Sequence, residues 1–246
     1  MTVETRKTIR VSIVLMPTKP SRPPARAAPV LFRDRAAFDP RERIVATARR
    51  HFFQFGFARC TMDDLAVELG MSKKTLYQHF RSKEALVDEL ITRKSGVMIA
   101  GFEEILSLPR LSFADRTARF HHHALGHLRE IHVAFLRDLR RFAPKTYQRI
   151  EDQRALNVPR LWQRLLQAGI EAGAVRADVD VAFAANLVLI TMQNLLLPEN
   201  LERLEVQPHE VMSRFFNLLF TGLLTKAGCT DYENHRASFI RPNASR

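Results

Sequence analysis

Apolar residues recur every three or four positions from residue 40 to about residue 224, the spacing of helices that bury one face. No stretch of this sequence alternates apolar and polar residues over the length of a β-strand. Glycine, proline and small hydroxylated residues divide the apolar pattern into segments of helical length. The pattern therefore predicts an all-α fold.

Helix start and stop signals define four helices in the first half of this pattern. They run from Pro40 to Gly56, from the cap Thr61 to Gly70, from the cap Ser72 to Phe80, and from the cap Ser82 to Pro109. Five further helices are expected: one opened by Ser112, then residues 131–142, 146–172, 181–197 and 208–224. The helix that begins at Ser82 is long enough to belong to two domains.

The two short helices joined by a turn with Gly70 predict a helix-turn-helix, whose second helix fits the DNA major groove. The sequence has no acidic residue between Glu68 and Glu84, although it has several basic ones in that interval: Lys73, Lys74, Arg81 and Lys83. Phosphates repel carboxylates and attract these cations, so this window favours DNA contact.

Four segments follow from these patterns. Residues 1–39 carry five prolines among basic and small residues, and we expect them to form a disordered N-terminal extension, unless translation begins at Met16 or later. Residues 40–85 are the expected DNA-binding domain, and residues 86–228 the expected larger helical domain. Residues 229–246 turn polar again, which predicts a tail.

Charge and cysteine content narrow the choice of partner and compartment. The formal net charge is +12, so an anionic partner is expected, with nucleic acid ahead of an anionic membrane. No apolar run approaches the roughly 20 residues of a membrane-spanning helix. Cys60 and Cys229 form no disulfide framework, which favours a reducing compartment, and we expect a cytoplasmic protein.

Two sequence segments carry a resemblance to a known family. RIVATARRHFFQFG at residues 43–56 and TMDDLAVELGMSKKTLYQHFRSKEAL at residues 61–86 resemble the N-terminal signature of the TetR family of transcriptional regulators. Residues 169–180 and 221–224 are similar to that family as well. One departure is Lys74, where the family often has glycine, and this adds charge near the groove.

The resemblance implies an all-helical homodimer with a small DNA-binding head and, at residues 86–228, a larger, variable domain for effector binding and dimerisation. Thr61, Tyr77, His79 and Lys83 would hold phosphates, Lys73, Lys74 and Thr75 would face bases, and the capped helix start at Ser72 would offer N–H groups to phosphate. The function it implies is that of a repressor released from operator DNA by a small, largely apolar effector.

Two further sets of residues are candidates within the larger domain. The expected effector pocket is apolar and largely aromatic, lined by Met98, Phe102, Phe113, Phe120, Phe135 and Trp162. The expected dimer interface combines small and large apolar residues on the last two predicted helices: Ala184, Val188, Thr191, Leu195, Phe215, Leu219, Gly222 and Leu223.

Two other functions remain open from the sequence. A histidine run at residues 121–123, with His127 one turn beyond His123, has a spacing that binds metal, which suggests a metal-dependent helical enzyme. However, no acid or cysteine other than Glu130 completes a ligand set, and no catalytic motif occurs, so we expect no metal, no cofactor and no enzyme. A DNA-binding regulator controlled by a protein partner, or by nothing, is the third hypothesis.

Overall fold

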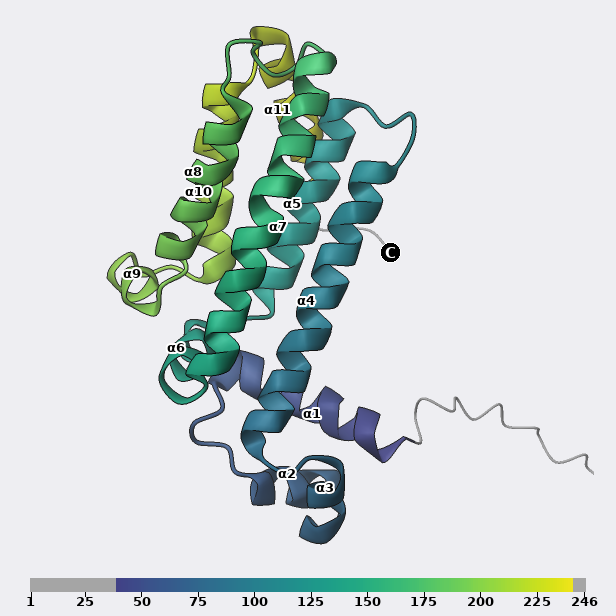
Figure 1. Ribbon diagram of the computed structural model, residues 1–246, viewed down its shortest axis with the longest axis vertical. Coiled ribbons are helices and arrows are strands. Elements are labelled where there is room, and N and C mark those ends of the chain that lie inside the picture. Colours follow the sequence, from purple (N-terminus) through teal and green to yellow (C-terminus); the bar gives the residue numbers. More distant parts are fainter. Residues whose placement is uncertain (1–38, 241–246) are drawn as a thin grey trace, which may run out of the picture. The chain divides into compact units, whose positions relative to one another are not determined.

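The computed structural model describes residues 39–240, and side chains as far as residue 234 (Figure 1). All secondary structure elements in this range are helices, which confirms the prediction of an all-α fold. They are α1 (Pro40–Phe55), α2 (Met62–Leu69), α3 (Lys73–His79), α4 (Lys83–Ser107), α5 (Phe113–Arg129), α6 (Val133–Phe142), α7 (Pro144–Glu171), α8 (Val181–Leu195), α9 (Pro198–Arg203), α10 (Pro208–Leu223) and α11 (Lys226–Ile240).

Side-chain caps fix the beginnings of the first four helices. Asp39 accepts a hydrogen bond from the amide of Arg41 at the start of α1. Thr61 and Asp64 form a capping box at α2, while Ser72 and Ser82 cap α3 and α4. Because each cap satisfies N–H groups that the helix itself leaves unpaired, the sequence determines these boundaries locally.

Helices α1–α4 enclose a small apolar core and form the head of the protein. Its central side chains are Phe52, Leu65, Leu76 and Leu86, none more than 1% exposed. Gly70 ends α2 in the left-handed conformation, with φ of 63°, and so turns the chain toward α3. This core holds α3 in place with the N-terminal residues of the helix at the surface.

The larger domain consists of α4 to α11. Figure 1 shows α4, α5 and α7 running alongside one another, and α7 also packs along α8, while α10 packs on α5. The side chains of Phe120, Leu165, Leu166 and Phe220 are 2% exposed or less and fill the interior. None of the described helices has the length and apolarity that a membrane crossing requires.

The prediction of a polar tail from residue 229 is wrong for residues 229–240, which belong to α11. This helix packs on α5, and its Tyr232 is 8% exposed and stacks on Phe220 with ring centroids 5.3 Å apart. Four polar residues, 233–236, follow Tyr232 in this helix, which leaves little apolar periodicity to detect. The expected extension at residues 1–38 and the last six residues lie outside the described residues.

A smaller correction concerns the end of α8. The helix was expected to continue to Leu197, but it ends at Leu195, and Pro198 opens the short helix α9. Proline lacks an N–H group and fits the first turn of a helix, where no intrahelical acceptor is needed. Pro198 therefore starts one helix and does not simply end another.

Candidate functional site

Helix α3 has the position and exposure of a recognition helix. Ser72 Oγ accepts a hydrogen bond from the amide of Thr75 at 3.1 Å, which caps α3. Lys73 and Lys74 follow at once and are exposed, whereas Leu76 and Phe80 anchor the opposite face in the core. The first turn of α3 thus presents two cations at the surface of the head.

The two lysines differ in their surroundings. Lys73 Nζ lies 2.5 Å from Asp63 Oδ2 on α2, and this hydrogen bond raises the pKa of Lys73. The segment between Glu68 and Glu84 contains no acidic residue, but in the folded protein Asp63 of α2 lies next to Lys73. Lys74 has no hydrogen-bond or ion-pair partner among the described residues, and its full charge is available to an anion.

The other expected DNA-binding residues also lie on the head. Thr61 Oγ1 accepts from the amide of Asp64 at 3.1 Å and donates to its carboxylate at 2.7 Å, so it is engaged in the cap of α2. Tyr77 is 45% exposed on α3, and His79 is half-buried at the end of that helix. Thr61 thus lies at the start of α2, and Tyr77 and His79 lie on α3, all within the head.

Lys83 takes a position that the sequence did not indicate. Its ammonium group donates to the carbonyl oxygens of Phe57, Ala58 and Cys60 at 2.8, 3.3 and 3.0 Å. All three N–H groups are thereby committed to the loop between α1 and α2. The expected contact of Lys83 with phosphate would compete with these bonds.

Asp138 of α6 holds the same loop from the larger domain, and sequence reasoning missed it. Its Oδ2 atom accepts from the amides of Phe57 and Ala58 at 2.8 and 2.7 Å, and the side chain is buried at 8% exposure. A Cβ atom on Gly56, which has φ of 80°, would lie 2.4 Å from this oxygen. The sequence did contain one sign of this role: Asp138 follows Phe135 by three residues and adjoins Leu139, so an acidic residue falls on the apolar face of α6.

We call residues 56–60 the hinge loop. Its amides bind Asp138 of the larger domain, and its carbonyls bind Lys83 of the long helix α4. Hydrogen bonds to charged groups are stronger than neutral ones, contributing about 1.5–3 kcal/mol each. The bonds from α4 and α6 therefore fix the path of the chain into α2. They thereby also fix the position of α3.

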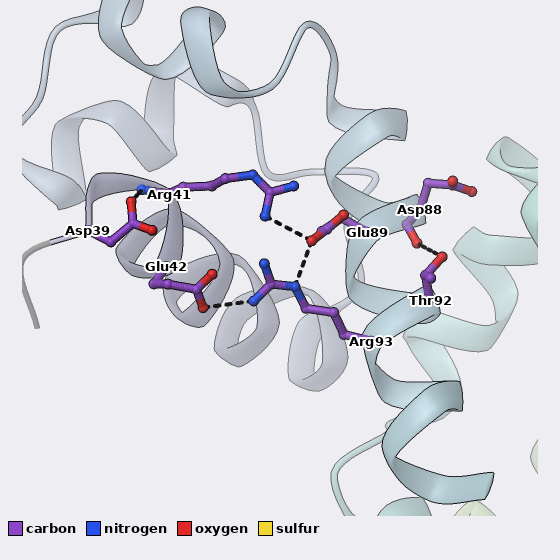
Figure 2. A network of polar contacts seen from close by, with 7 residues as sticks. All are labelled: Asp39, Arg41, Glu42, Asp88, Glu89, Thr92 and Arg93. Carbon is purple, nitrogen blue, oxygen red and sulfur yellow. Dashed lines mark hydrogen bonds and ion pairs between the residues drawn. The ribbon is translucent and has the colours of Figure 1, made fainter. Parts of the chain in front are cut away.

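A network of ion pairs joins the start of α1 to α4 (Figure 2). Arg41 Nη1 lies 2.9 Å from Glu89 Oε1, and Arg93 bridges Glu89 and Glu42 at 2.6 and 2.7 Å. Arg41 and then Arg93 lower the pKa of Glu89, and Arg93 lowers that of Glu42. Since these side chains are partly exposed, the network orients the two helices more than it stabilises them.

A cavity of about 120 Å³ lies inside the larger domain, enclosed by side chains of α4 to α8 and of α10. Five of the six expected pocket residues line it: Met98, Phe102, Phe120, Phe135 and Trp162. Phe113 does not, because it packs close to Gly169, where a Cβ atom would lie 2.6 Å from Phe113 Cε2. The cavity walls are predominantly apolar, as in most sites for small molecules.

Two histidines of α5 lie at this cavity: His127 lines it, and His123 packs on Phe102 of its wall. His123 Nε2 lies 2.9 Å from the carbonyl oxygen of Met98, and the rings of His123 and His127 are 4.6 Å apart. Burial, and then the charge of Lys94, lowers the pKa of His127 to about 4, so the ring is neutral at pH 7. No cluster of three or more metal-binding side chains occurs among the residues that the structure describes.

Two residues of the expected dimer stripe on α8 are buried within their own subunit. Ala184 and Val188 are 5% and 0% exposed and face the core of their own subunit. The exposed apolar side chains of α8 are Phe183, Leu187 and Ile190. Of the other expected interface residues, Gly222 is exposed, and five are half-buried: Thr191, Leu195, Phe215, Leu219 and Leu223.

Comparisons with known proteins agree with this arrangement. The family model described as "Bacterial regulatory proteins, tetR family" matches residues 44–90. The HTH-type transcriptional repressor KstR2 of Mycobacterium tuberculosis is 31% identical over 150 residues, which cover 57% of this chain and 72% of that repressor. All of α1, except its first turn, and the helix-turn-helix fall within the matched family region.

Two solved structures share the fold. A TetR-family regulator from Marinobacter aquaeolei has a TM-score of 0.60 at 18% identity, covering 83% of this chain and all of that one. The ketosteroid transcriptional regulator KstR2 of M. tuberculosis has a TM-score of 0.53 at 22% identity, covering 77% of this chain and 97% of that one.

The role of Asp138 can be tested by removing its carboxylate. We expect Asp138→Ala to lower the free energy of unfolding by about 2–4 kcal/mol, because two hinge-loop amides lose a charged acceptor. Asp152→Ala is the matched control on α7, where the carboxylate accepts only from exposed Gln148. Urea denaturation followed by circular dichroism measures both, and equal effects of the two substitutions would contradict the role of Asp138.

Proposed function

The chain belongs to the TetR family of bacterial regulatory proteins, and from this premise we propose that it is a dimeric repressor released from its operator by a small, largely apolar effector. As a member of that family it is a DNA-binding regulator of transcription. We propose that the effector binds in the cavity of the larger domain, and that the protein acts in the cytoplasm without catalysing a reaction.

The observation that carries this proposal is that α6 belongs to both the cavity and the support of the head. Phe135, Leu136 and Leu139 of α6 line the cavity. Asp138, on the same helix, binds the hinge loop between α1 and α2. A displacement of α6 by a ligand therefore acts directly on the loop that positions the DNA-binding helices.

Contacts to DNA follow from the exposed side chains of the head. We assign base contacts to Lys73, Lys74 and Thr75 at the start of α3. Phosphate contacts are assigned to Thr61, Tyr77 and His79, to the capped start of α3 at Ser72, and to Lys83. To bind DNA, Lys73 must break its ion pair with Asp63, and Lys83 must weaken its hydrogen bonds to the hinge loop. Lys74 loses no such interaction when it contacts DNA.

Release from DNA follows from unequal binding of the effector to two arrangements of the heads. Two recognition helices in a two-fold dimer read two half-sites only when they lie about 34 Å apart, or a multiple of that distance. An effector that prefers another spacing lowers DNA affinity, and about 1.4 kcal/mol of preference gives a tenfold loss.

The role of Lys74 is tested by the salt dependence of DNA binding. We expect Lys74→Ala to reduce the slope of log K against log salt concentration by about 0.9 unit, because the DNA interface loses one cation that releases counterions from the DNA. A duplex selected from a random library and a random duplex serve as probes, measured by fluorescence anisotropy. Lys145→Ala, an exposed position on α7, should leave the slope unchanged. An unchanged slope for Lys74→Ala would refute its place at the phosphates or bases.

The proposed dimer rests on apolar side chains that one subunit leaves exposed on α8 and α10. Phe183, Ile190 and Leu218 are 67%, 56% and 77% exposed. We expect Ile190→Asp to convert a micromolar dimer to monomer, because a partner copy would bury the added charge. Leu156→Asp, at a position on α7 that is 66% exposed, is the control and should leave the dimer intact. Sedimentation that shows a monomeric wild type would contradict the proposal.

A further inference from the structure

The cavity combines apolar walls with a positive charge. Two cationic side chains, Lys94 of α4 and Arg154 of α7, line it, and its described lining contains no aspartate or glutamate. His127 also lines it but is neutral at pH 7 because its pKa is lowered to about 4. An anionic group inside the cavity therefore meets two cations whose partner carboxylates lie outside the lining, while an additional cation finds repulsion.

The two cations are held differently. Arg154 pairs with Glu151 of its own helix at 2.5 Å, and both side chains are largely buried. Lys94 is only 9% exposed, and its ammonium lies 2.8 Å from Glu130 Oε2 and 5.2 Å from the centre of the Phe53 ring. Its partner Glu130 lies at the end of α5, outside the lining of the cavity.

Glu130 is shared with the DNA-binding head. The same Oε2 atom that binds Lys94 lies 2.5 Å from Arg49 Nη2 of α1. The chain of contacts from Lys94 through Glu130 to Arg49 thus runs from the cavity wall to the head. A group in the cavity that attracts Lys94 competes directly with Glu130 for its ammonium.

We propose that the cavity binds an apolar carboxylic acid, whose carboxylate pairs with Lys94 in place of Glu130 and whose hydrocarbon part lies among the aromatic side chains. This inference rests on the proposed function and deepens it by naming the chemical class of the effector. Lys94 is then a ligand-binding residue, and Arg49 and Glu130 transmit its movement to α1.

The small size of the cavity means that a bound acid displaces the surrounding helices. Its volume of about 120 Å³ is below the roughly 150 Å³ of a cavity that accommodates benzene. We expect an acid with a longer chain to displace the walls, which include the flexible Met98 and side chains of α4, α6 and α7. Binding of the acid therefore separates helices that also support the head.

The test compares octanoate with 1-octanol, which has the same chain without the charge. Calorimetry and the fluorescence of Trp162, the single tryptophan, follow binding. We expect wild-type protein to prefer octanoate at least tenfold, and Lys94→Met to reduce this preference below threefold while it keeps its affinity for octanol. Lys145→Met is the matched control and should keep the full preference.

A second variant tests the exchange itself. Glu130→Gln removes the competing carboxylate, and we expect it to strengthen octanoate binding several-fold without changing the affinity for octanol. The proposal is overturned if octanol binds wild type as tightly as octanoate, if Lys94→Met keeps the preference, or if neither compound binds. Binding of the wild-type protein to the selected duplex, measured without either compound, tests the proposed function separately. If the protein does not bind DNA, the proposed function is refuted. If it binds DNA but not octanoate, only the ligand class is refuted.

Discussion

The structure depends on how the hinge loop, residues 56–60, is held. Two of its amides bind the buried carboxylate of Asp138, and three of its carbonyls bind the ammonium of Lys83. Opposite charges on two different helices thus satisfy the backbone of one short connection. Since this loop leads into the helix-turn-helix, the geometry of the DNA-binding surface is determined by α4 and α6, outside the recognition helix itself.

The same two helices form walls of the cavity in the larger domain, and this gives the protein two routes from the cavity to the head. One passes along α6, where Phe135 and Leu139 face the cavity and Asp138 binds the hinge loop. The other passes from Lys94 of α4 through Glu130 to Arg49 of α1. A ligand needs no long chain of intermediates, because each route consists of one helix or one shared carboxylate.

The sequence predicted what local interactions determine. The caps Thr61, Ser72 and Ser82, the turn at Gly70 and the apolar spacing of α1 to α4 involve residues a few positions apart, and the structure contains each of them. Contacts between distant residues were out of reach, such as Asp138 with the hinge loop or Asp63 with Lys73. On α8 apolar residues lie on more than one face of the helix, so spacing alone did not show that Ala184 and Val188 are buried in their own subunit. On α11 the polar run at residues 233–236, which follows the buried Tyr232, left too little apolar pattern to predict a helix.

The central claim is that the cavity and the DNA-binding head are energetically coupled, and coupling between two binding sites is reciprocal. Trp162 lies in the cavity wall at 2% exposure and reports occupancy of the cavity directly. The most direct measurement is the dissociation constant of octanoate, from Trp162 fluorescence, with and without a saturating amount of the selected DNA duplex. The account predicts that bound DNA raises this constant at least tenfold, and an identical constant in both conditions would contradict it.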